Sequence, residues 1–160
     1  MSASPNRQTG REMSLKTRGV AAMAGTLGYE LDVRTMTEDE RAEARQQIED
    51  YKRYYELIHH GTYYRLTDVE KNRDFAAWQF VSRDKRESLV SVVMLHAQSN
   101  PLFLRVRVRG LEENLRYSVD GSRETWEGSA LMYGGLNLPA GCGDNQGIQF
   151  FIQAADGPAS

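Results

Sequence analysis

The sequence has little cysteine, almost no net charge and no long apolar run. Its single cysteine, Cys142, excludes an internal disulfide and a cysteine-rich zinc site, which favours a reducing compartment. Twenty Lys and Arg against twenty-two Asp and Glu give a net charge of -2, so bulk charge favours neither nucleic acid nor an anionic membrane. No stretch approaches the roughly 18 apolar residues of a membrane span, and the first residues lack a signal peptide's apolar core. We therefore expect a cytoplasmic protein without nucleic-acid or membrane partners.

Length and hydrophobic content set the size of the fold. With 160 residues, 40% of them hydrophobic, the chain is long enough to bury the core of one ordinary domain. It is too short for a complete eight-stranded β/α barrel, which takes about 250 residues.

The clearest predicted element is a helix over residues 38–60. Thr37 and Glu40 have the spacing of a capping box, and Gly61 is placed to end the helix. Apolar residues recur at intervals of four and three, which predicts one buried stripe. The stripe consists of Ala44, Ile48, Tyr51, Tyr55 and Ile58.

Strands are predicted on both sides of this helix. Before it, residues 20–23 and 27–33 are candidate short strands among glycine-rich loops. After Gly61 the hydrophobic pattern changes to alternation, as between residues 105 and 109, where three arginines alternate with two valines. Turn signals at intervals of roughly ten to fifteen residues are typical of an antiparallel sandwich. Strands are predicted at 63–66, 75–81, 89–97, 103–108, 116–119 and 148–154.

Two carboxylates on one predicted strand face, Glu30 and Asp32, have the spacing of an acid and base pair. Side chains two residues apart on a strand lie roughly 6 to 7 Å from each other, which permits glycosidase chemistry. The competing interpretation is a structural ion pair with a neighbouring arginine such as Arg34. The structural interpretation is the favoured one.

Metal and nucleophile sites have weak support. His59 and His60 are adjacent on the predicted helix, so their side chains diverge by about 100° and no third ligand follows at a suitable spacing. Histidines at a helix end are better explained by the negative end of the helix dipole. Cys142 has no histidine partner in the sequence pattern and is read as a free thiol in a loop. No metal site is predicted.

Aromatic side chains and glycines are further candidates for ligand sites. A sugar platform is one use of the aromatics, and core packing is the commoner use. Gly25 and Gly28 lack the Lys-Ser/Thr ending of a phosphate loop, so no nucleotide or other cofactor is assigned. The aromatics in question are Tyr51, Tyr54, Tyr55, Tyr63, Tyr64, Trp78 and Trp126.

Several strings together resemble the C-terminal end of family 36 glycoside hydrolases, the α-galactosidases that act on melibiose and raffinose-type sugars. PNRQTGR at 5–11 and TRG at 17–19 are similar to the family's Pro-Asn-His-Gln and Glu-Thr-Arg-Gly segments. GTLGYELD at 25–32 is the most specific string, and GTYYRL at 61–66 and GSALM at 128–132 follow in family order. Arg7 departs from the family by replacing its usual histidine.

The family's two catalytic motifs are absent from this sequence. Family 36 enzymes use a nucleophilic aspartate in a Lys-Trp-Asp segment and an acid/base aspartate in a Ser-Asp segment. Trp78 and Trp126 are not followed by aspartate, and no Ser-Asp dipeptide occurs. Retaining hydrolysis needs two carboxyl groups about 5 to 5.5 Å apart. We therefore expect no catalytic residue and no activity of this chain alone.

The resemblance implies that the chain is the C-terminal, non-catalytic part of such an α-galactosidase, as a fragment or a truncated gene product with an α+β fold. Residues 1–61 would be the last β/α unit of the barrel, and residues 62–160 the C-terminal antiparallel β-sandwich. The implied role is structural support of the barrel and oligomerisation. The alternatives are a stand-alone carbohydrate-binding sandwich and a module that complements a separately encoded barrel in trans.

Site and partner predictions follow from the same resemblance. Asn6, Gln8 and Arg11 are the residues expected to reach the rim of the active site. The expected partner is a second copy of the chain or the rest of the enzyme, and α-galactosides would be met only through the missing barrel. No cofactor is expected.

Overall fold

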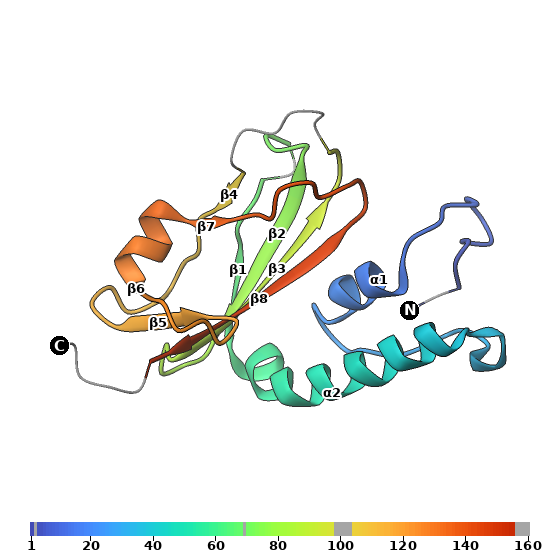
Figure 1. Ribbon diagram of the computed structural model, residues 1–160, viewed down its shortest axis with the longest axis horizontal. Coiled ribbons are helices and arrows are strands. Elements are labelled where there is room, and N and C mark those ends of the chain that lie inside the picture. Colours follow the sequence, from blue (N-terminus) through green and yellow to red (C-terminus); the bar gives the residue numbers. More distant parts are fainter. Residues whose placement is uncertain (2, 69, 98–103, 156–160) are drawn as a thin grey trace.

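The structure is a computed structural model that describes residues 1, 3–68, 70–97 and 104–155. Six strands form one antiparallel sheet in the order β1-β2-β3-β8-β5-β6, and β4 and β7 form a separate ribbon. The helices α1 and α2 lie on one side of the sheet, and the ribbon and a π-helical turn lie on the other (Figure 1). The strands are β1 (Thr62–Arg65), β2 (Phe75–Val81), β3 (Glu87–Met94), β4 (Arg105–Val106), β5 (Arg116–Val119), β6 (Thr125–Glu127), β7 (Leu136–Asn137) and β8 (Gly147–Ala154). The helices are α1 (Leu15–Ala22), the 3-10 turn η1 (Val33–Thr35), α2 (Glu38–His60) and the π-helical turn η2 (Ala130–Gly134).

The central strands are apolar on both faces because both faces are covered. On the ribbon side, Phe75 of β2 belongs to a core cluster with Val106 of β4. On the helix side, Phe80 of β2 packs with Leu57 of α2 and with Leu89 of β3. A strand that is covered on both faces carries apolar residues on both, whereas a strand with one face in solvent alternates apolar and polar residues. The molecule is therefore an α+β fold with an inner antiparallel sheet.

Most predicted strands are present, with corrections at their ends. The ranges of β2 and β5 are as predicted, and β1 and β8 begin one residue earlier. β3 ends at Met94 instead of residue 97 because the N–H groups of Leu95 and His96 donate to the Asp74 carbonyl, outside the ladder. Of the predicted strand 103–108 only Arg105–Val106 is a strand, and residue 103 lies outside the described residues. The predicted sandwich has only a two-stranded ribbon as its second sheet in the part of the chain described.

The two strands predicted before α2 are wrong. Residues 20–22 belong to helix α1, and Val20 is a buried residue of that helix. The helix is capped by Ser14, whose side chain accepts a hydrogen bond from Thr17 N. A short apolar run does not distinguish a helix from a strand, which explains the error. Between 27 and 33 the backbone forms one isolated bridge, where Glu30 N donates to Met1 O at 2.7 Å. Before Thr62, the described residues form no strand.

Helix α2 has the predicted bounds and capping box, and its buried stripe agrees in part with the predicted one, because Ala44, Tyr51 and Ile58 are buried or half-buried. Thr37 Oγ1 accepts from Glu40 N, and the Glu40 carboxylate accepts from Thr37 N. Ile48 and Tyr55, predicted to be buried, are 39% and 45% exposed. A polar residue, Gln47, is buried instead, because its amide hydrogen-bonds to Leu15 O, Glu43 and the Tyr29 hydroxyl. The buried or half-buried positions of the helix include Gln47, Tyr51, Tyr54, Leu57 and Ile58.

Buried polar groups connect the sheet to both of its neighbouring layers. The side-chain amide of Gln79 in β2 accepts from Arg109 N at 2.8 Å and donates to Arg109 O at 3.0 Å. On the other face, Thr17 Oγ1 of α1 donates to Asn145 O and accepts from Gly147 N, both at 2.8 Å. A Cβ on Gly147 would lie 2.9 Å from Thr17 Cα, so only glycine permits this approach. The layers are thus in fixed register.

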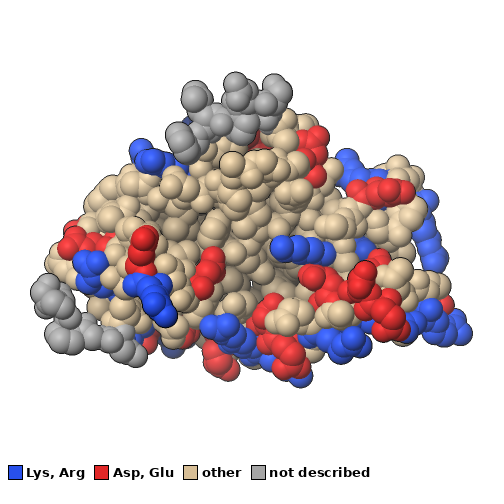
Figure 2. Space-filling model, viewed as in Figure 1, with Lys and Arg blue, Asp and Glu red and all other residues tan. Residues whose placement is uncertain are grey.

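The surface in the view of Figure 2 carries charges of both signs. Lys and Arg side chains alternate with Asp and Glu along the edge formed by α2 and the N-terminal segment, and the middle of this face is largely uncharged. Among the described residues, no helix has the length and apolar character required to cross a membrane.

Candidate functional site

Two of the three predicted rim residues line one hollow in the N-terminal loop. The hollow has a volume of about 370 Å³ and is lined by Asn6, Arg7 and Gln8 together with Ala3 and Glu30. It is open and polar, and the side chains of Gln8, Arg7 and Glu30 are exposed. Such a surface offers hydrogen-bond donors and acceptors to a polar ligand but does not enclose one.

The loop that carries these residues is organised by Asn6. Its Oδ1 accepts hydrogen bonds from Gln8 N and Thr9 N, both at 3.0 Å, and its carbonyl accepts from Gly10 N at 2.8 Å. Gly10 has a φ of 66°, a conformation that favours glycine. Side-chain bonds of this kind are the reason that asparagine is common in turns. The backbone of Gln8 is therefore held in position by the side chain of Asn6.

Arg11, the third predicted residue, does not line the hollow. Its carbonyl accepts from Asn6 N at 2.9 Å, so it closes the loop through its backbone. Arg7, which the sequence analysis treated only as a departure from the family, lines the hollow in its place. Sequence spacing alone did not distinguish the two arginines, because the turn at Gly10 decides which one points inward.

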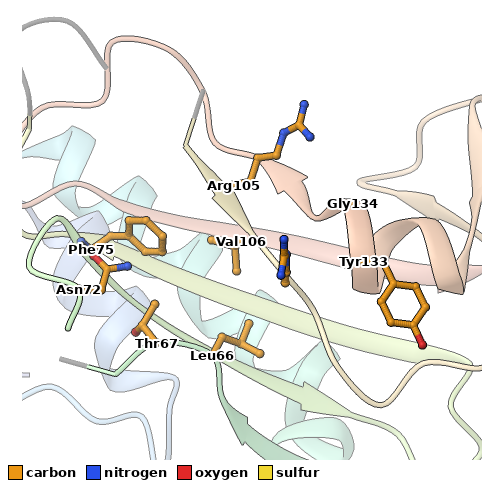
Figure 3. A pocket seen from close by; sticks show the side chains of 9 residues that line it. Leu66, Thr67, Asn72, Phe75, Arg105, Val106, Tyr133 and Gly134 are labelled. Carbon is orange, nitrogen blue, oxygen red and sulfur yellow. Dashed lines mark hydrogen bonds between the residues drawn. The ribbon is translucent and has the colours of Figure 1, made fainter. Parts of the chain in front are cut away.

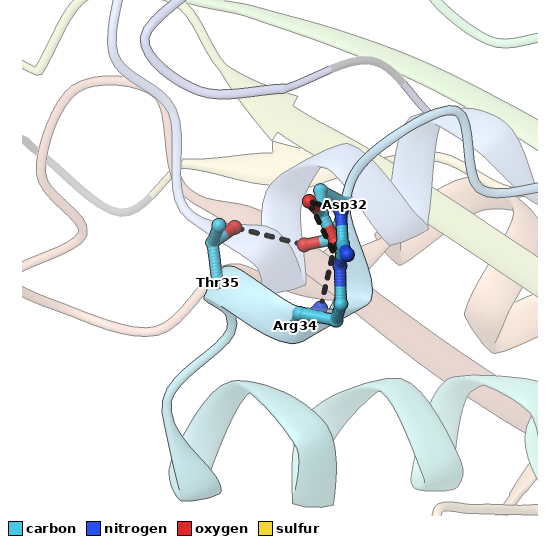
Figure 4. A network of polar contacts seen from close by, with 3 residues as sticks. All are labelled: Asp32, Arg34 and Thr35. Atoms are coloured by element: carbon cyan, nitrogen blue, oxygen red, sulfur yellow. Dashed lines mark hydrogen bonds and ion pairs between the residues drawn. The ribbon is translucent and has the colours of Figure 1, made fainter.

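The carboxylates Glu30 and Asp32 do not form an acid and base pair. Asp32 accepts from Arg34 N at 3.0 Å and forms an ion pair with the Arg34 guanidinium at 2.8 Å (Figure 4). The Arg34 side chain, followed by its backbone N–H, holds the pKa of Asp32 below its usual value. Asp32 therefore forms an ion pair with Arg34 and caps the start of η1, which agrees with the favoured interpretation.

The histidines and the cysteine have local partners. His59 Nε2 lies 2.8 Å from the Tyr51 hydroxyl, and His60 lies 3.6 Å from a Glu56 carboxylate oxygen. Cys142 Sγ lies 3.1 Å from the Pro139 carbonyl. Within the described ranges, no three His, Cys, Asp or Glu side chains are grouped so as to hold a metal ion.

The aromatic side chains are divided among several places and form no single platform. Tyr51, Tyr55 and His59 stack along α2, with ring centroids 5.9 Å apart for the two tyrosines and 4.3 Å apart for Tyr55 and His59. Tyr54 packs on Phe151 of β8 at 5.2 Å, inside the helix–sheet interface. Among the described residues the most exposed large hydrophobic side chain is Tyr133, at 68%, which is not one of the aromatics considered for a sugar platform.

Comparison with known proteins matches the two ends of the chain to two family descriptions. Residues 1–61 match "Melibiase", and residues 75–152 match "Glycosyl hydrolase family 36 C-terminal domain". The bifunctional alpha-galactosidase/sucrose kinase AgaSK of Mediterraneibacter gnavus is 44% identical over 150 residues, which cover 94% of this chain and 16% of that protein. Alpha-galactosidase AgaA of Geobacillus stearothermophilus is 42% identical over 139 residues, covering 87% of this chain and 19% of AgaA.

Solved structures show the same relationship in three dimensions. The galactosidase domain of AgaSK superposes with a TM-score of 0.91 at 43% identity, over 96% of this chain and 21% of that one. The alpha-galactosidase of Lactobacillus brevis superposes with a TM-score of 0.93 at 32% identity, over 99% of this chain and 22% of that one. The chain thus spans about a fifth of the length of these relatives. In sequence and in fold, the chain belongs to glycoside hydrolase family 36, whose C-terminal region it matches.

Proposed function

We propose that the chain serves as the C-terminal, non-catalytic part of an alpha-galactosidase. The observation that carries this proposal is the match of nearly the whole chain to about a fifth of proteins named alpha-galactosidases. The sequence has no Lys-Trp-Asp or Ser-Asp segment. Of the two neighbouring carboxylates, Asp32 is committed to Arg34. The bond-cleaving carboxylates would therefore come from the rest of the enzyme, and galactosides would be bound chiefly there.

The division of the chain at Gly61 is part of this proposal. Residues 1–61 would complete a β/α barrel, and residues 62–160 would form the terminal β domain beside it. Supporting this, the Met1 amino group donates to Gly28 O and Glu30 N donates to Met1 O, so Met1 lies beside residues 28–30. Ile48 and Tyr55 leave an apolar stripe on the outer side of α2. The neighbouring helices of a barrel would cover such a stripe.

Asn6, Gln8 and Arg7 would then lie at the rim of the active site. Their polar side chains suit contacts to sugar hydroxyl groups, and the Asn6 turn holds them in place without substrate. Arg11 would contribute by closing the loop. The same proposal includes a cytoplasmic enzyme, as the single cysteine favours, and a homo-oligomer.

Complementation in trans tests the proposal. The chain is co-purified with the upstream part of AgaSK, cut at the corresponding position, and hydrolysis of p-nitrophenyl α-galactoside is measured. We expect no hydrolysis by the chain alone and activity of the mixture above that of the upstream part. Tyr55→Arg places a charge on the exposed α2 stripe and should lower the recovered activity at least about tenfold. Tyr133→Arg, a matched change at another exposed tyrosine, should not. Turnover by the purified chain alone would contradict the proposal.

The alternative, a stand-alone sugar-binding module, has the exposed ring of Tyr133 in its favour. Calorimetric titration of the chain with galactose, melibiose and raffinose separates the two functions. A structural part gives no saturable heat, whereas a binding module gives heat that Tyr133→Ala abolishes.

A further inference from the structure

A groove lined by arginines runs along the outer side of the ribbon. Three adjoining hollows of about 420, 600 and 310 Å³ compose it. The first two share Arg105, and the first and third share Arg107 and Tyr133, so the hollows are continuous. Arg109 lines the third. We call this feature the arginine groove.

The backbone beneath the arginine groove is firmly held. Val106 and Val108 point into the core at 2% and 1% exposure, which leaves the alternating arginines at the surface. Arg105 Nε donates to Asn137 Oδ1 of β7 at 2.9 Å, and the buried amide of Gln79 binds both backbone polar groups of Arg109. Residues two apart on an extended chain are separated by roughly 7 Å. The backbone positions of the three exposed arginines are therefore held in a row.

The charge of the arginine groove is not balanced by carboxylates. Asp74 is the one acidic residue among those that line the three hollows. In the described part of the chain, the guanidinium groups of Arg107 and Arg109 make no hydrogen bond or ion pair. This local excess contrasts with the net charge of -2 for the whole chain. The cationic lining residues are Lys71, Arg73, Arg105, Arg107 and Arg109.

The floor and one end of the groove are apolar. Figure 3 shows Leu66, Phe75 and Val106 along the floor and the Tyr133 ring at one end. Tyr133 lies in the π-helical turn η2, and its hydroxyl donates to Glu113 Oε1 at 2.8 Å while its ring stays exposed. Single π-helical turns occur frequently at functional sites. The groove thus places a flat aromatic surface next to the Arg107 guanidinium, which has no partner among the described residues.

We propose that the arginine groove binds a phosphate group. A guanidinium matches phosphate with two parallel hydrogen bonds, and several guanidinium groups attract a phosphate dianion more strongly than they attract a singly charged carboxylate ligand. Arg105 and Arg107 hold the phosphate oxygens, and Tyr133 packs against any organic part of the ligand. This site goes beyond the proposed function and does not depend on it.

Calorimetric titration of the 160-residue chain tests the site. The probes are inorganic phosphate, glucose 6-phosphate and AMP, at one ionic strength balanced with KCl. Arg107→Gln and Arg105→Gln should each weaken binding about tenfold or more, because each removes charge-assisted hydrogen bonds. Arg45→Gln, a matched change at an exposed arginine of α2 outside the groove, should leave binding unchanged. Equal affinities for the three probes would assign the groove to free phosphate. Tighter binding of AMP or glucose 6-phosphate would assign it to a phosphate ester.

Tyr133 gives a second readout. Tyr133→Ala should weaken the binding of AMP at least about fivefold relative to the binding of inorganic phosphate, because a base stacks on an aromatic ring. Tyr133→Phe keeps the ring and should bind AMP as the unaltered chain does. Circular dichroism confirms that each variant is folded. The absence of saturable heat with all three probes overturns the proposal, as does an Arg45→Gln effect equal to that of Arg107→Gln.

Discussion

At the residue scale, a few buried polar side chains determine how the layers fit together. Thr17, Gln47 and Gln79 are 1%, 4% and 0% exposed, and each bonds to backbone groups of a distant segment. Burying such groups is costly unless every one of them is paired. These hydrogen bonds therefore fix the position of the layers relative to one another, which apolar contacts alone would not do.

Thr17→Val tests this role. Valine keeps the shape of threonine, but it leaves Asn145 O and Gly147 N without their partner at the junction of α1 and β8. We expect a loss of about 1–3 kcal/mol in the free energy of unfolding, measured by urea denaturation. Thr26→Val, at an exposed position, is the control. A Thr17 variant as stable as the control would contradict the assignment.

At the element scale, α2 is fixed by its ends more clearly than by its faces. Glu38, Asp39 and Glu40 lie in the first turn and His59 and His60 in the last, so the residue types at both ends suit the helix dipole. The capping box determines where the helix starts. These are local effects, which is why the sequence predicted the bounds correctly.

Thr37→Ala removes the capping box. The Glu40 N–H loses its acceptor, so we expect a decrease of about 0.5–2 kcal/mol in the free energy of unfolding. Thr37→Ser and Thr37→Asp keep an acceptor and should recover most of it. If alanine and serine gave equal stability, the cap would have no energetic role.

At the scale of the whole molecule, the helices cover one face of the sheet. Met23, Leu57 and Ile58 pack on Phe80 and Leu89. Removal of residues 1–61 would bare this face while leaving the larger core on the ribbon side intact. The two parts proposed above thus share an apolar interface.

The fragment 62–160 tests how far the β part stands alone. We expect it to keep its sheet, to melt at a lower temperature than the whole chain, and to bind the dye ANS more strongly because apolar surface is exposed. Circular dichroism and dye fluorescence measure these properties. Leu89→Ser, on the bared face, should lower dye binding by the fragment. A fragment without a cooperative melting transition would contradict the proposed division at Gly61.

The sequence by itself determined the features that depend on local chemistry. The capped helix, the central strands and the family resemblance follow from residue spacing and from strings such as GTLGYELD at 25–32. The order of these strings along the chain carried the family assignment, and the comparisons confirm it. Asn6 and Gln8 line the hollow and Arg11 does not, and the place of all three at the rim of an active site stays a prediction.

Only the tertiary structure decided which faces are buried. Gln47 is buried and Ile48 is exposed because α1, not hydrophobicity, determines which side of α2 faces inward. Residues 20–22 are helical because Val20 must pack against β8 while Thr17 bonds to it. The arginine groove likewise needs η2 to bring Tyr133 beside Arg107, more than twenty residues away in the sequence. These outcomes depend on contacts between distant segments, which no local pattern contains.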